Sequence, residues 1–111
     1  MTAEEGISKL RWYKRFVYGR KMEKVYFPQK SYVFTVCAYG SFLVDELIRK
    51  IRYSDADPIR IVGQMYTELD YVLGESDDDH FVTHDFAALM EEECGKILQY
   101  LKFEEEKNAE T

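Results

Sequence analysis

Apolar side chains recur at steps of three and four residues along most of this chain, the spacing that places them on one face of an α-helix. The longest such pattern begins near Ser31 and runs for about 23 residues, or about 35 Å of helix. Its apolar positions are Val33, Val36, Cys37, Gly40, Leu43, Val44, Leu47, Ile48 and Ile51. Because the first half of this segment is apolar on nearly all sides, we expect it to lie at the centre of the fold.

Three further helices are predicted around it. Residues 3–18 form the first, with Thr2 and Glu5 in the spacing of a capping box and Gly19 as its end. The third begins at the Asp57-Pro58 pair, where Asp caps and Pro takes the first helical position. The last is capped at or shortly before Thr83 and ends near residue 103.

Four amphipathic helices with fairly short connections predict an all-α fold, an antiparallel four-helix bundle. Residues 1–103 would form one helical domain, and the charged residues 104–111 a frayed tail. A competing α+β interpretation stays open. Residues 32–39 are rich in β-branched and aromatic side chains, so a small hairpin over residues 24–39 could pack on the helices.

Charge is distributed unevenly along the 111 residues, although the net value is only −6. Residues 1–60 carry 12 Lys/Arg and 7 Asp/Glu, a net charge of +5, whereas residues 61–111 carry 3 and 14, a net charge of −11. Such a division indicates a basic binding face, an acidic one, or two halves that attract each other.

The cellular context is constrained by the cysteines and by hydropathy. Cys37 and Cys94 stand alone in apolar segments, as reduced, buried thiols do. No secretory signal pattern is visible, and the longest uncharged run, residues 31–44, is shorter than the ~18 residues of a membrane span. We therefore expect a cytoplasmic protein that does not associate with membranes.

Few residues suggest catalysis or metal binding. His80 and His84 are one helical turn apart, and Asp79 and Glu91 could complete a metal site. The alternative without a metal site is that the nearby aspartates cap a helix. Residues 91–93 are three consecutive glutamates, which point in three directions and are usually solvated. With no nucleophile motif or phosphate-binding glycine loop, we expect no enzyme activity and no cofactor.

Basic and aromatic residues alternate between residues 9 and 30, as in proteins that bind single-stranded nucleic acid. The candidate contacts to nucleic acid are Lys14, Arg15, Arg20 and Lys21. The overall acidity opposes this interpretation, and the same cations could instead pair with the acidic last helix.

The 15% aromatic content includes nine tyrosines, more than a core of this size buries with satisfied hydroxyls. Some are therefore expected on a contact surface, for which the candidates are Tyr26, Phe27, Tyr53, Tyr66, Tyr71 and Tyr100. Taken together, the sequence predicts a small non-catalytic helical module for protein interaction or regulation that self-associates, with a protein or a second copy as partner. Nucleic-acid binding and a metal site at His80 and His84 are the alternatives.

Overall fold

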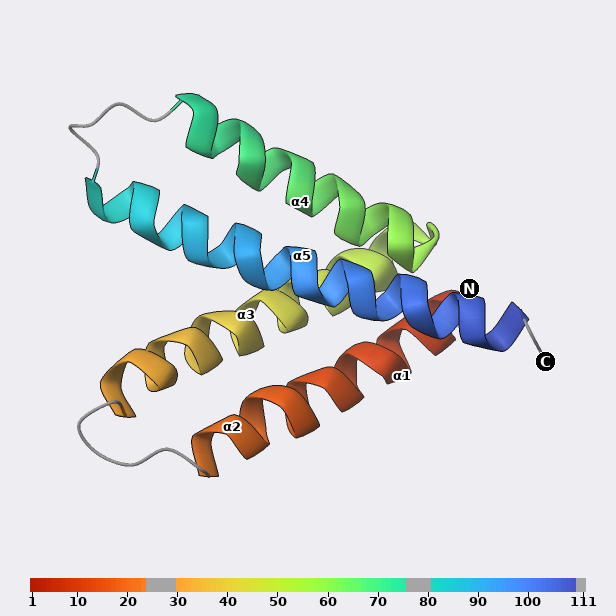
Figure 1. Cartoon of the computed structure of the whole chain (residues 1–111). Helices are drawn as coiled ribbons and strands as arrows, with labels where there is room; N and C mark the ends of the chain where they lie inside the picture. Colours follow the sequence, from red (N-terminus) through yellow and green to blue (C-terminus); the bar gives the residue numbers. More distant parts are fainter. Residues whose placement is uncertain (24–29, 76–80, 110–111) are drawn as a thin grey trace.

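The chain folds into long helices that pack side by side (Figure 1). The computed structural model describes residues 1–23, 30–75 and 81–109, and every regular element within these ranges is helical. The elements are α1 (Ala3–Tyr13), η1 (Lys14–Gly19), α2 (Arg20–Glu23), α3 (Lys30–Ser54), α4 (Pro58–Glu75) and α5 (Phe81–Ala109). The predicted all-α bundle is confirmed. Because residues 30–39 are helical, the hairpin alternative is wrong for the part of it that the structure describes.

The helices are arranged as two hairpins that meet at one end. α1, η1 and α2 form one continuous helix beside α3, and α4 lies beside α5. Figure 1 shows both hairpins converging where α1 begins and α5 finishes, and diverging toward the opposite end. α3 contacts each of the other five helical elements. It is therefore the central helix, as its apolar pattern predicts.

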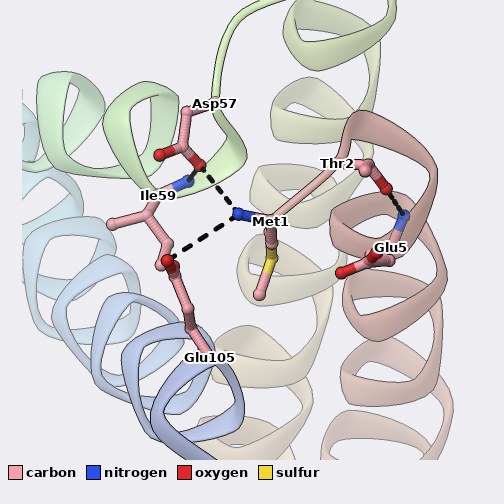
Figure 2. Close-up of polar contacts among 6 residues, drawn as sticks. All are labelled: Met1, Thr2, Glu5, Asp57, Ile59 and Glu105. Carbon is pink, nitrogen blue, oxygen red and sulfur yellow. Dashed lines mark hydrogen bonds and ion pairs between the residues drawn. The ribbon is translucent and has the colours of Figure 1, made fainter. Parts of the chain in front are cut away.

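Two side chains cap helices as the sequence predicts. Thr2 Oγ1 accepts a hydrogen bond from the backbone N–H of Glu5 at 3.1 Å, and Asp57 Oδ1 accepts one from Ile59 at 3.2 Å. Figure 2 shows that the amino nitrogen of Met1 also approaches Asp57 Oδ1, at 4.0 Å, and Glu105 Oε1, at 3.8 Å. The amino group of Met1 thus links the start of α1 to Asp57 at the start of α4 and to Glu105 in the last turns of α5.

The first helix does not end at Gly19 as predicted but continues to Glu23. It passes through η1, a π-helical segment of six residues, before α-helical geometry returns in α2. A π-turn holds one more residue than an α-turn, so the residues after η1 lie on other faces than they would in an uninterrupted α-helix of the same length. Glycine costs a helix only about 1 kcal/mol, and here that cost does not stop it.

The last helix also runs further than its apolar pattern indicates. α5 continues to Ala109, past the predicted end near residue 103. Lys9 Nζ of α1 lies 3.0 Å from Glu104 Oε2, and both side chains are partly buried. This ion pair, together with the approach of Met1 to Glu105, holds the first part of the predicted tail against the bundle.

The core lies where the hairpins converge, and all four helical segments contribute to it. Its fully buried side chains are Leu10, Tyr18, Leu43, Val44, Leu47, Ile51, Pro58, Val62, Cys94, Ile97 and Leu101. Gly6 allows α1 to approach α4, because a Cβ at this position would overlap the ring of Pro58. Both cysteines are buried and unpaired, in agreement with the sequence prediction.

The expectation that the first half of α3 is enclosed is wrong. Tyr32 is 70% exposed, Phe34 59% and Phe42 57%. This half of α3 lies toward the end where the hairpins diverge (Figure 1). The second hairpin contacts it through Tyr39 and Phe86, whose ring centroids are 4.8 Å apart, and leaves the rings of Tyr32, Phe34 and Phe42 exposed. The apolar pattern of α3 therefore describes both a core helix and an exposed aromatic surface.

Candidate functional site

A groove of about 830 Å³ runs between the first helix and α3. Arg11, Lys14 and Arg15 line it from the first helix, followed by Tyr18, Gly19 and Met22; α3 contributes Phe34, Cys37, Ala38, Ser41, Asp45, Ile48, Arg49, Arg52 and Tyr53. From Phe34 to Arg52 the helix rises about 27 Å, at 1.5 Å per residue. The groove is thus long enough to hold a segment of a macromolecule.

Two contacts fix the separation of the groove walls. Lys14 Nζ lies 2.8 Å from Oδ1 and 3.0 Å from Oδ2 of Asp45, an exposed bidentate ion pair. One helical turn along, the ring of Tyr18 lies against Gly40, where a Cβ would overlap its Cζ, Cε1 and hydroxyl atoms. Only glycine leaves room for the ring at this position, so Gly40 sets how closely η1 approaches α3.

The hydroxyl group of Tyr18 is hydrogen-bonded to a buried carboxylate. Glu93 of α5 is 4% exposed, and its Oε1 accepts a hydrogen bond from the Tyr18 hydroxyl at 3.0 Å. Its Oε2 lies 3.1 Å from Lys96 Nζ. Because both oxygens have partners, the cost of burying this charge is offset. The contact joins η1 of the first hairpin to α5 of the second.

The surroundings of Tyr18 keep its hydroxyl protonated. Burial raises the pKa of Tyr18 far above its ordinary value of 10.0, and the negative charge of Glu93 raises it further. The same two causes, in the same order, raise the pKa of Tyr13, whose ring meets that of Tyr18 edge-on at 5.5 Å. Tyr18 therefore remains a hydrogen-bond donor to Glu93 throughout the physiological pH range.

The groove is divided into two chemically different halves. Its five cationic side chains, Arg11, Lys14, Arg15, Arg49 and Arg52, all lie in the half that includes Asp45. The other half, from Tyr18 and Ser41 to Met22 and Phe34, is lined by neutral and mostly apolar side chains. Asp45 is the one acid among the lining residues and is paired with Lys14. The first half can attract anions, and the second can bury apolar groups.

The four residues predicted to contact nucleic acid are only partly brought together. Lys14 and Arg15 line the groove, whereas Arg20 and Lys21 are exposed outside its lining. Arg15 and Arg20 stack over the ring of Phe16, with guanidinium-to-centroid distances of 5.4 and 4.9 Å. Two cations that the sequence prediction did not include, Arg49 and Arg52, complete the cationic half from α3.

The predicted interface tyrosines lie in different environments. Tyr53 and Tyr71 are highly exposed, as an interface residue would be. Tyr66 is partly buried beside Glu91, whose charge raises the pKa of its hydroxyl. Tyr100 stacks on Trp12 at 5.7 Å, and burial raises its pKa to about 12. Tyr26 and Phe27 lie outside the described residues.

The predicted metal site stays a prediction, because Asp79 and His80 lie outside the described residues and the side chain of His84 is not described. Glu91 is partly buried, and its Oε2 has no hydrogen-bond partner in the described structure. No group of three or more potential metal ligands occurs among the residues that are described.

Sequence reasoning missed Glu93, which it assigned to a solvated run of glutamates. The feature that could have identified Glu93 as buried is its position in the helix. Residue 93 continues the spacing of three and four residues that relates the buried positions Ala87, Cys94, Ile97 and Leu101. A glutamate in the phase of an apolar stripe indicates a buried carboxylate that needs a partner. Its link to Tyr18, 75 positions earlier, has no such signal.

Comparison with protein-family models, with curated protein sequences and with solved structures found no significant match for this chain. Within its described residues, no helix has the length and apolar character needed to cross a membrane. The function must therefore be inferred from the surfaces themselves.

Proposed function

We propose that this protein is a non-catalytic helical interaction module that forms a homodimer, and that it acts in the cytoplasm. The observation that carries the proposal is an aromatic face, defined as Tyr32, Tyr39 and Phe42 of α3 with Phe86 of α5. Tyr39 and Phe86 link the two helices at a ring-centroid distance of 4.8 Å. The reduced state of the buried cysteines suits a cytoplasmic location.

The aromatic face has the composition of a protein interface. Its α3 members are spaced at seven and three residues, which places them on one side of the helix. Tyr32, Phe42 and Phe86 are exposed and Tyr39 lies partly buried between them. Exposed aromatic side chains that share one face are typical of contact surfaces, where aromatic residues contribute most. Apposition of this face with its equivalent in a second copy would cover it in both subunits.

Light scattering over a range of protein concentrations tests the proposal. The wild-type protein should approach twice its mass of 13.2 kDa as the concentration rises. Changing Tyr32 and Phe42 together to serine should shift the protein to the monomer with little loss of stability, since neither ring is enclosed. Phe103→Ser is the matched control, because Phe103 is 63% exposed but lies in α5, outside the aromatic face. A wild-type protein that stays monomeric at every concentration contradicts the proposal.

Binding of single-stranded nucleic acid is the second candidate function, favoured by the five cations and by the exposed rings of Phe34 and Tyr53 in the same groove. Salt separates the two candidates, because binding to phosphates weakens steeply with salt whereas association of aromatic faces does not. Titration of a fluorescent single-stranded RNA at low and high salt measures this. No binding at low salt eliminates the second candidate.

A further inference from the structure

Two arginines of the groove lining have no ion-pair partner among the described residues. Arg11 and Arg52 both line the groove and also line a smaller hollow beside it, of about 320 Å³, with Glu4, Ile7 and Ser8. Neither guanidinium makes an ion pair with any described residue, whereas Lys14 and Arg49 are paired with Asp45 and Glu46. Like charges gathered in this way attract an anionic group, which relieves their mutual repulsion.

The other half of the groove attracts a different chemistry. Met22, Phe34 and Ala38 line it, with the Sγ of Cys37 buried at its base, and no lining residue there is charged. An apolar surface in a concave site is covered favourably by aliphatic or aromatic side chains. A ligand that fills the whole groove therefore needs negative charge at one end and apolar side chains at the other.

From this division we infer that the groove binds a helix of a partner protein, about 18 residues long, that is acidic in one half of its length and apolar in the other, with its carboxylates toward Arg11 and Arg52 and its apolar side chains toward Met22 and Phe34. Eighteen residues of helix span the same rise of about 27 Å as the groove wall in α3. The arrangement is a helix-in-groove mode of recognition. This site is separate from the aromatic face and goes beyond the proposed self-association.

Nucleic acid fits the same groove less well. A polynucleotide carries a negative charge on every phosphate, so a strand along the groove would place several phosphates against the uncharged half. A second copy of this chain offers acidic residues in α5, but Glu104 and Glu105 are already engaged by Lys9 and the amino group of Met1. Both occupants are kept as outcomes of the test.

The test uses three probes and two charge-reversal variants of the full chain. The first probe is a synthetic 18-residue helical peptide with leucine and alanine in one half and glutamate and alanine in the other. The second has lysine in place of glutamate, and the third is an 18-nucleotide single-stranded RNA. Isothermal titration calorimetry or fluorescence anisotropy measures each affinity for the wild type, for Arg11→Glu with Arg52→Glu, and for Arg60→Glu, an exposed α4 arginine that does not line the groove.

The glutamate peptide should bind the wild type, and the double variant should lose about tenfold or more of that affinity. Arg60→Glu should bind like the wild type, and the lysine peptide should not bind. Phe34→Ser should weaken the binding of the glutamate peptide, because an apolar contact is lost. A purely electrostatic attraction would not depend on this side chain. Tighter binding of the RNA, equal binding of both peptides, or no binding of the glutamate peptide overturns the inference. If the Arg11 and Arg52 double variant also abolishes dimerisation, the groove belongs to the contact with a second copy and the inference is overturned. If only the Tyr32 and Phe42 variant abolishes dimerisation, the groove is free for a partner protein.

Discussion

The two halves of α3 have the same apolar spacing and opposite surroundings. In the C-terminal half, Leu43, Leu47 and Ile51 are fully buried where the two hairpins converge. In the N-terminal half, one face packs on Tyr18 through Gly40, while Tyr32, Phe34 and Phe42 are exposed. Periodicity reports which faces of a helix are apolar, but the neighbouring elements decide which of those faces become core and which remain available for contact.

The largest effect should separate the two halves directly. Leu47→Ala should lower the free energy of unfolding by about 2 to 5 kcal/mol, because a buried side chain is removed and a cavity remains. Phe42→Ala should change it by no more than about 0.5 kcal/mol while reducing self-association. Urea denaturation of both variants, followed by the fluorescence of Trp12, measures the difference. Similar losses in the two variants would show that the N-terminal half is enclosed after all.

A substitution at the boundary between the halves should have the next largest effect. Gly40→Ala introduces a methyl group into the ring of Tyr18, which must move away from α3 and strain its hydrogen bond to Glu93. We expect a loss of about 1 to 3 kcal/mol in the free energy of unfolding. Gly63→Ala is the control, since a Cβ there meets nothing within 4 Å. It should be neutral or slightly stabilising, and an equal loss in both variants would rule out the close packing of Tyr18.

Alkaline pH should weaken the enclosed region selectively. Burial raises the pKa of the Cys94 thiol from 9.0 to about 12, and that of Tyr18 also lies above its ordinary 10.0. The unfolded chain therefore releases these protons at lower pH than the folded chain does. Their contribution to stability is complete below about pH 9 and decreases as pH rises, by about 1.4 kcal/mol per pH unit for each group that only the unfolded state has ionised.

Urea midpoints at pH 8, 10 and 11 measure this loss. Cys94→Ala should reduce the slope by the share of one thiol, although the variant itself is less stable at pH 8. A midpoint that is constant from pH 8 to 11 would mean that these groups are accessible to water in the native state.

The smallest effect is expected just beyond the enclosed half of α3. Asp55 follows the last residue of α3 with φ of 54°, a left-handed conformation that glycine adopts freely and that other residues adopt at a cost, which is smallest for Asn and Asp. Asp55→Gly should raise the free energy of unfolding by up to about 1 kcal/mol, and Asp55→Ala should lower it. Thermal melting compares them. If both variants melt at the wild-type temperature, the backbone at residue 55 is not strained.

Much of the fold follows from local signals. The helix starts at Thr2 and Asp57 depend on short-range hydrogen bonds within three residues, which a sequence displays directly. The predicted end at Gly19 failed because the contact of Tyr18 with Gly40 and Glu93 outweighs the preference of one glycine to end a helix. That contact joins residues far apart in the chain, so only the folded structure reveals it.

Only part of the groove could be predicted from the sequence, because its two walls come from different helices. The basic run contributes Lys14 and Arg15, but its other half depends on which face of α3 turns toward the first helix. In the sequence, Arg49 and Arg52 lie near the C-terminal end of a predicted helix, where cations stabilise the helix dipole. The structure adds that they share a groove with Arg11, a relation that depends on the packing of two helices and not on spacing within either.

The π-turn at η1 also affects how this protein tolerates changes in length. Because a π-turn holds one more residue than an α-turn, deleting one residue between positions 14 and 17 would restore ordinary α-helical hydrogen bonding and leave the flanking residues on the faces they now occupy. The same deletion within α1, at Trp12, would instead rotate the preceding residues by about 100° and turn the core residue Leu10 outward. The core and the cationic half of the groove should therefore tolerate the loss of a residue within η1 better than the same loss in α1.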